Sequence, residues 1–197
     1  MTNRHRCKSV YVSDQGDHAM IKYRTLCNVT GKIFLTGMLA AFAPIAQAQE
    51  KQNAAAYVMT VIGDRAAGEQ VISGAYGQAI ESLTANTAKR SSRFAAANNL
   101  CVAYTKTNRL SEAERACSAA IRNSKATYAA WYDVNRKRDF YAVALSNRGV
   151  IRAVSGDTEQ ARQDFRAAMR ISSTLSAPAE NLAALQAKTT ETLAARK

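Results

Sequence analysis

The chain has 197 residues and a formal net charge of +12, and it contains only two prolines, nine glycines and 7% aromatic residues. This length limits it to one compact domain, or to a few stacked repeats behind a targeting segment. Scarce proline and glycine, together with abundant alanine, favour closely packed helices over a turn-rich sheet architecture. A basic chain could associate with nucleic acid, an anionic membrane or an acidic protein surface, so charge alone selects no partner.

Residues 20–48 have the layout of a cleavable secretory signal peptide. A positive stretch precedes an apolar run from Ile33 to Ile45, and small residues follow, so we expect cleavage between Ala48 and Gln49. The alternative is a membrane-spanning helix, but this run reaches only about 20 Å, short of a hydrocarbon core of about 30 Å. The sequence therefore predicts an exported protein, periplasmic or secreted, with no transmembrane helix after processing.

Residues 1–19 are polar and irregular, whereas Met20 opens a signal of ordinary length. Our hypothesis is that residues 1–19 are a mis-assigned or disordered extension and that translation begins at Met20 rather than Met1. His5 and His18 are the only histidines, and both precede Met20. The processed chain would then hold no histidine for catalysis or metal binding, and residues 49–197 would still carry a net charge of +8.

Two segments, residues 96–121 and 145–169, can be laid on each other as helix–turn–helix units. Small residues at matching positions let antiparallel helices approach closely, and we expect Gly149 to approach Ala161 in this way. The units resemble tetratricopeptide repeats, whose pattern has Leu-Gly and Tyr on the first helix and two alanines around a large residue on the second. The residues expected to pack within the repeats are Leu100, Tyr104, Ala113, Ala120, Gly149, Ala161, Phe165 and Ala168.

The phasing of the alanines extends the resemblance to residues 72–195. Ala79 lies 34 residues before Ala113, which is the length of a tetratricopeptide repeat, so a half-repeat precedes the two fuller units. Ala113 and Ala161 are 48 residues apart, so about 14 extra residues separate those units, within residues 123–140.

The predicted fold is all-α, a short helix–turn–helix solenoid of the tetratricopeptide type behind the signal peptide. Residues 176–196 are expected to form a C-terminal helix that caps the array. Residues 49–71 form a poorly defined N-terminal segment. The second unit departs from the family pattern, because Arg148 and Arg152 stand where the family has Leu and an aromatic residue.

Cys101 and Cys117 are the only cysteines after residue 48, and each lies eight residues from Arg109 in the turn. Facing positions on paired helices put Cα atoms about 3.5–5.5 Å apart, which overlaps the disulfide range of about 4.4–6.8 Å. Export to an oxidising compartment favours a disulfide, which would stabilise the fold by about 3 kcal/mol. Two reduced, buried cysteines are the alternative, and a redox pair is disfavoured because no Cys-x-x-Cys occurs.

Members of the tetratricopeptide family often bind an extended peptide in a groove lined by the first helix of each repeat. The resemblance therefore implies an unidentified protein or peptide as the partner. The carboxylate-gripping set of Lys, Arg and Asn that some members have is not reproduced. The matching groove positions are Asn98, Val102, Thr105, Lys106, Ser146, Val150 and Ala153.

Basic residues recur every four positions at Arg162, Arg166 and Arg170, on one face of a predicted helix. Two further basic clusters lie at residues 89–93 and 136–138. Such a row is ordinarily a solvated face with cations near the helix end. The alternative is peripheral contact with an anionic lipid, polymer or protein; nucleic acid is not expected outside the cytoplasm.

The sequence carries no phosphate-binding loop, Gly-x-Ser-x-Gly turn, metal-binding histidine pair or calcium-loop spacing. We therefore expect no catalysis, cofactor or bound metal. The leading hypothesis is an exported, non-catalytic module for protein–protein or protein–peptide interaction. The alternative is a basic envelope protein that associates with anionic lipid or cell-wall polymer through arginine-rich helix faces.

Overall fold

The computed structural model describes residues 57–63, 66–85, 93–126 and 134–194. In these ranges the chain forms seven helices and no strand, so the predicted all-α class is confirmed for the described residues. The expected signal peptide and its cleavage site lie outside them. None of the described helices is both long and apolar enough to cross a membrane. The helices are α2 (Ala66–Ile72), α3 (Tyr76–Ala85), α4 (Arg93–Lys106), α5 (Leu110–Ala126), α6 (Val134–Val154), α7 (Thr158–Ile171) and α8 (Ala177–Ala194).

Three pairs of consecutive helices, α2 with α3, α4 with α5 and α6 with α7, are joined by turns of one design. Each turn has a residue with positive φ: Gly74 at 86°, Asn108 at 59° and Gly156 at 87°. The next residue donates its N–H to the carbonyl oxygen five residues back, over 2.8 Å in all three turns. This backbone reversal ends a helix and satisfies its last carbonyls. The turns recur 34 and 48 residues apart, the same spacings as the alanines.

Small side chains bring the paired helices together. Ala113, Ala120, Ala161 and Ala168 have no exposed surface. Gly149 of α6 faces the ring of Phe165 of α7, and a Cβ added to Gly149 would lie 2.6 Å from the Cε1 atom of that ring. The Phe165 ring, rather than Ala161, therefore supplies the atoms nearest to Gly149. Leu100 and Tyr104 are partly buried and pack against the same core.

Covalent and aromatic contacts join the helices further. Cys101 of α4 and Cys117 of α5 form a disulfide with their Cα atoms 5.0 Å apart, inside the expected range. The rings of Phe94 in α4 and Phe140 in α6 stack with centroids 4.4 Å apart, which links the two hairpins. Part of the extra sequence between them lengthens helices, since α5 continues to Ala126 and α6 begins at Val134.

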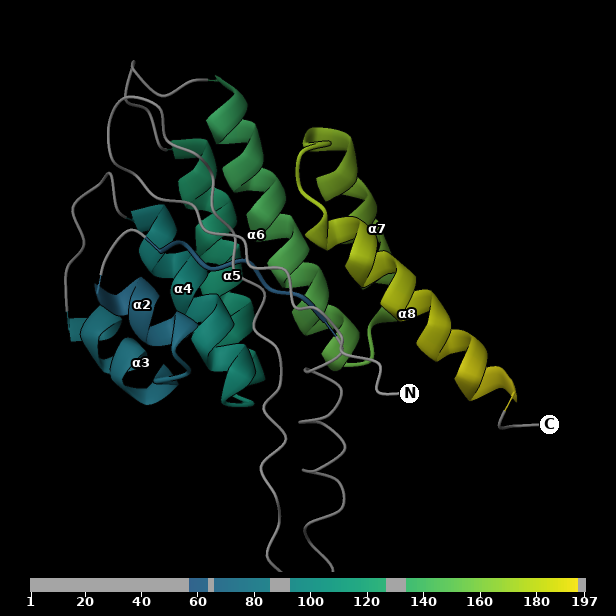
Figure 1. The fold of residues 1–197 in the computed structure, drawn as a ribbon, viewed down its shortest axis with the longest axis horizontal. Helices are drawn as coiled ribbons and strands as arrows, with labels where there is room; N and C mark the ends of the chain where they lie inside the picture. The colour runs from purple at the N-terminus through teal and green to yellow at the C-terminus, as the bar shows by residue number, and fades with distance from the viewer. Residues whose placement is uncertain (1–56, 64–65, 86–92, 127–133, 195–197) are drawn as a thin grey trace, which may run out of the picture.

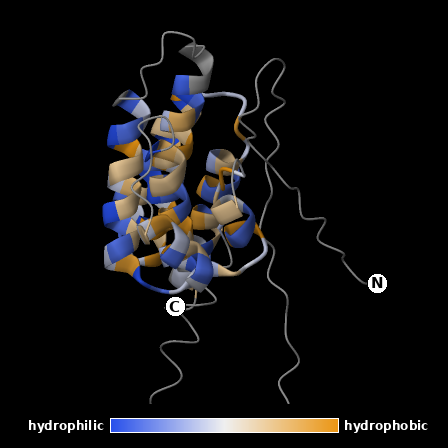
Figure 2. Cartoon of the chain, turned by 90° about the vertical axis from the view of Figure 1, so that its left-hand side faces the viewer, coloured by the Kyte–Doolittle hydropathy of each residue, from blue (hydrophilic) through white to orange (hydrophobic). Residues whose placement is uncertain are grey.

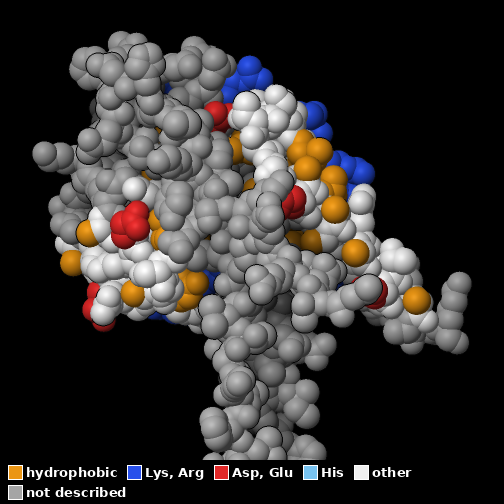
Figure 3. All heavy atoms as spheres, in the orientation of Figure 1, with side chains coloured by type: hydrophobic (Ala, Val, Ile, Leu, Met, Phe, Trp, Pro, Cys, Tyr) orange, Lys and Arg blue, Asp and Glu red, His pale blue; other side chains and the backbone are white. Residues whose placement is uncertain are grey.

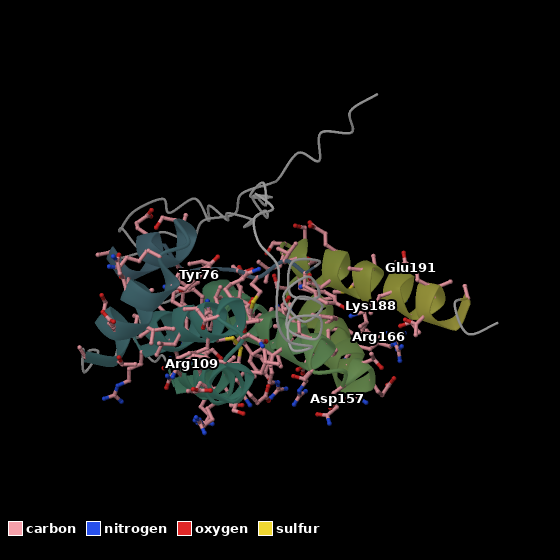
Figure 4. All side chains as sticks on the ribbon, turned by 90° about the horizontal axis from the view of Figure 1, so that it is seen from below. Tyr76, Arg109, Asp157, Arg166, Lys188 and Glu191 are labelled. Carbon is pink, nitrogen blue, oxygen red and sulfur yellow. A yellow bond between two sulfur atoms is a disulfide. The ribbon has the colours of Figure 1, made fainter. Side chains whose placement is uncertain are left out.

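Several of the helices carry hydrophilic and hydrophobic residues in turn along the ribbon, as Figure 2 illustrates. The pattern is that of amphipathic helices, which bury one stripe and hydrate the other. The side chains at the two later turns lie along one side of the molecule, where Figure 4 labels Arg109 and Asp157. Asp157 caps α7, because its side chain accepts a hydrogen bond from the N–H of Gln160 at 3.2 Å.

The segment from Tyr57 to Gly63, which we call the arm, belongs to no helix or strand. Figure 1 shows it in dark blue, crossing the helices between α6 and α2. Its sequence is rich in apolar and β-branched residues, whose local propensity favours an extended chain over a helix. Contacts to α4, α6 and α8 instead hold the arm in place.

Candidate functional site

Val58, at the start of the arm, is held by Asn181 of α8. The Val58 N–H donates to Asn181 Oδ1 at 2.7 Å, and Asn181 Nδ2 donates to the Val58 carbonyl at 2.8 Å. One carboxamide therefore satisfies both backbone groups of one residue. Asn181 Nδ2 also lies 3.5 Å from the hydroxyl oxygen of Ser146 on α6, which helps to fix its orientation.

Thr60, at the centre of the arm, is held in the same way by Asn147 of α6. Its N–H donates to Asn147 Oδ1 and its carbonyl accepts from Asn147 Nδ2, both at 2.9 Å. Asn98 of α4 adds a second donor to the same carbonyl at 2.9 Å. Asn147 Nδ2 also donates to Asn98 Oδ1 at 2.9 Å, so the two side chains orient each other.

Ile62, near the end of the arm, is held by Asn99 of α4. The Ile62 N–H donates to Asn99 Oδ1 at 2.9 Å, and Asn99 Nδ2 donates to the Ile62 carbonyl at 2.8 Å. The helix α2 then packs closely on this end, because a Cβ added to Gly68 would lie only 2.3 Å from the Ile62 carbonyl oxygen. Glycine at position 68 is therefore required for this approach.

Three asparagines each bond to both the N–H and the carbonyl of one arm residue, and they occupy equivalent positions in the sequence. Asn147 follows Asn99 by 48 residues, and Asn181 follows Asn147 by 34 residues. These are the spacings of the helical turns and of the alanines. The helices α4, α6 and α8 thus contribute one carboxamide each, and together the three carboxamides hold every second residue of the arm. We call the set Asn98, Asn99, Asn147 and Asn181 the asparagine face.

Asparagine suits this task because its planar carboxamide carries both a donor and an acceptor. In an extended chain the N–H and C=O of one residue point to the same side, and the next residue points to the other. A carboxamide therefore pairs with alternate residues, as it does here. On the side of the arm these hydrogen bonds involve only backbone atoms, so this part of the recognition is independent of the side chains that the arm carries.

The side chains of the arm add apolar contact. Tyr57, Met59 and Val61 are buried in the same core cluster as Val102 of α4 and Val150 of α6. Burial raises the pKa of Tyr57, and its hydroxyl has no hydrogen-bond partner in the structure. The site therefore accepts the ring of Tyr57 but makes no use of its hydroxyl.

Most of the predicted groove positions lie beneath or beside the arm. Val102, Val150, Ala153 and Asn98 are buried, and Asn98 is the only one of them that bonds to the arm through its side chain. The Thr105 hydroxyl is used within α4, where it donates to the Cys101 carbonyl at 2.7 Å. Of the two remaining positions, Ser146 is buried near Asn181, and desolvation lowers the pKa of Lys106.

Sequence reasoning missed Asn99, Asn147, Asn181 and the arm itself. The signal was available for the asparagines, because they repeat with the same 48- and 34-residue spacings as the alanines. It was overlooked because the family pattern emphasises small and large apolar positions. The arm carried no comparable signal, since its hydrogen-bond partners lie between 37 and 123 residues away.

The two arginines that depart from the family pattern have a partner on α7. Arg148 makes two hydrogen bonds to Asp164, at 2.8 and 2.7 Å, and Arg152 makes one at 2.8 Å. The Asp164 side chain is only 6% exposed. Its hydrogen bonds raise the pKa of Arg148 further above its already high value. This ion triplet joins α6 to α7 through two positions where the tetratricopeptide pattern would have Leu and an aromatic residue.

The predicted basic face is only partly available. Arg162 forms an ion pair with Glu159, one turn earlier on α7. Arg166 and Arg170 are exposed, and no ion pair to another described residue is seen for either. Figure 3 shows Lys and Arg side chains along the edge of the molecule that carries α7 and the start of α6. Lys89 and Arg90 lie outside the described residues.

Comparisons with protein-family models, with curated proteins and with solved structures found no match.

Proposed function

We propose that this protein is an exported, non-catalytic helical-repeat module of the tetratricopeptide type that binds an extended segment of protein or peptide. The observation that supports this proposal is the asparagine face, where carboxamides from α4, α6 and α8 hold alternate residues of an extended chain. Recognition through backbone bonds and apolar contact needs neither cofactor nor catalytic group. One bonded residue for each of α4, α6 and α8 is an arrangement that a repeat array offers to a linear ligand.

Binding through the asparagine face should be insensitive to salt, because neither the carboxamides nor the backbone groups carry a charge. We would add the processed protein, residues 49–197, to an isotope-labelled peptide of the sequence of residues 57–63 and follow the backbone amide signals of the peptide by NMR, because the arm already occupies Asn98, Asn147 and Asn181 in the protein. Shifts of these signals at both low and moderate salt are expected. Replacing Asn147 with Ala should weaken binding at least about tenfold, since two hydrogen bonds are lost.

A second candidate is a basic envelope protein, and the exposed side chains of Arg166 and Arg170, which form no ion pair with a described residue, favour it. Association with vesicles that contain anionic lipid would then fall steeply between low and moderate salt. The double variant Arg166→Glu/Arg170→Glu should abolish it, while the matched variant Arg162→Glu should have a smaller effect. Vesicle binding of this kind, without any shift of the peptide amide signals, would refute the peptide-binding proposal in favour of this one.

A further inference from the structure

Building on the proposed function, we infer that the arm is a resident occupant of the asparagine face and that the partner is an extended segment of the same chemistry, which must displace it. The structure gives the template for that partner directly. Three properties of the arm matter: its backbone geometry, its alternating N–H groups that donate to the carboxamides, and its apolar side chains.

The hydrogen bonds define what a competing segment must provide. Residues equivalent to Val58, Thr60 and Ile62 each need an N–H, because each N–H donates to a carboxamide oxygen. Proline is therefore excluded at these three alternate positions. The position of Tyr57 holds a buried aromatic ring, and Phe should serve there as well as Tyr because the hydroxyl has no partner.

The helices do not depend on the arm for their own pairing. The Cys101–Cys117 disulfide joins α4 to α5. The Arg148–Asp164 ion pair joins α6 to α7, and the stacked rings of Phe94 and Phe140 join α4 to α6. The arm precedes α2, the first helix of the described residues, and it can leave without breaking the turn of any described hairpin. Displacement would thus exchange one extended occupant for another on a scaffold that persists.

Covalent attachment makes the arm a strong competitor. A segment tethered through a short linker acts at an effective concentration of about millimolar. A partner that makes the same contacts and binds an empty face with about micromolar affinity would be weakened roughly a thousandfold. A natural partner must therefore extend beyond the arm's contacts, and a variant that releases the arm should bind peptide much more tightly.

Thr60→Pro is the direct test, because it removes the central N–H from the arm while the asparagine face keeps all its residues. Thr60→Val is its matched control, since it changes the side chain and keeps the N–H. We expect Thr60→Pro to raise the affinity of the 57–63 peptide at least about tenfold over wild type, and Thr60→Val to leave it unchanged. Equal affinity of wild type and Thr60→Pro would overturn the inference and leave the proposed function standing.

Native-state hydrogen exchange of the wild-type processed protein tests the same inference without any variant that could fail to fold. The amides of Val58, Thr60 and Ile62 should exchange through an opening that leaves the α4–α7 amides protected. If the three amides exchange only by global unfolding, the arm is a permanent part of the core, and the inference is overturned. If arm opening is seen but no peptide binds even to Thr60→Pro, the proposed function has failed instead.

A last test changes only the backbone of the peptide and leaves its side chains as they are. N-methylation at the position of Thr60 removes a hydrogen bond to Asn147, whereas N-methylation at the position of Val61 removes an N–H that bonds to none of the described residues. We expect the first change to weaken binding to Thr60→Pro at least about tenfold more than the second. The reverse order would place the peptide in a different register or on a different surface, and would contradict the inference.

Discussion

Gly149 shows how a single missing methyl group determines the distance between two helices. In a helix interior, Gly→Ala ordinarily stabilises by about 0.5–1 kcal/mol. Here the added Cβ would lie 2.6 Å from Phe165 Cε1 in a fully buried contact. Overpacking of this kind costs about 1–3 kcal/mol, so Gly149→Ala should lower the free energy of unfolding by about 1–2 kcal/mol. Denaturant titration followed by circular dichroism measures this change.

Gly77 is the matched control for that prediction. It also lies in a helix, α3, but a Cβ added there would meet no atom within 4 Å. Gly77→Ala should therefore leave stability unchanged or raise it by up to about 1 kcal/mol. Combining Gly149→Ala with Phe165→Leu should recover part of the loss by making room for the methyl group. A stabilising effect of Gly149→Ala alone would disprove the close contact.

Arg148 and Arg152 of α6 both form ion pairs with Asp164 of α7. Asp164→Asn removes the charge but keeps the size, and it leaves two partly buried cations side by side. We expect a loss of about 2–3 kcal/mol, less than for a fully buried pair because both arginines are about one-fifth exposed. Thermal and denaturant unfolding measure it.

Glu159→Gln is the comparison for Asp164→Asn. Glu159 also pairs with an arginine on α7, Arg162, but its side chain is 63% exposed. Exposed pairs contribute little, so this variant should change stability by no more than about 0.5 kcal/mol. Equal effects of the two substitutions would mean that the Asp164 triplet is not the buried contact between α6 and α7 that the structure describes.

The hairpin of α4 and α5 is the element that the disulfide reinforces. The bridge closes a loop between residues 16 apart, which in the chain-entropy model stabilises by about 3 kcal/mol. Reduction of the processed protein should therefore lower the denaturant midpoint by a corresponding amount. In the double variant Cys101→Ala/Cys117→Ala the reductant should have no effect. Two free thiols in unreduced, denatured protein would contradict the bridge.

The helical hairpins could be predicted from sequence because their determinants are local. Gly74, Asn108 and Gly156 can adopt the positive φ that ends a helix, and small residues such as Ala113 and Ala161 mark the contacts nearby. Periodicity therefore located the hairpins and their 34- and 48-residue spacing. The disulfide could be predicted because Cys101 and Cys117 lie at equal distances in sequence from Arg109 in the turn.

The arm and the contacts that hold it could not be predicted in the same way. Thr60 finds its partners on α4 and α6, 38 and 87 residues away, and no short-range pattern encodes such a pairing. An apolar run like this one ordinarily pairs with another strand. Here side-chain carboxamides take the place of a neighbouring strand. For this reason the groove predicted from the sequence included Asn98 but neither the arm nor the other three asparagines.

The arm connects parts of the molecule that lie far apart in sequence. Asn147 is central to this connection, because it bonds both to Thr60 of the arm and to Asn98 of α4. Asn147→Ala leaves a buried N–H of Thr60 and the Oδ1 atom of Asn98 without partners. Each buried orphan costs about 1–3 kcal/mol, so we expect a loss of about 2–4 kcal/mol in the free energy of unfolding.

Asn181→Ala removes the same atoms at the far end of the arm and should cost less, about 1 kcal/mol, because partly exposed Val58 can bond to water. The comparison is measured by urea unfolding of both variants beside wild type. Equal losses would contradict the central position of Asn147. A larger loss for Asn147→Ala would mean that α4 and α6 share one cooperative contact at Thr60.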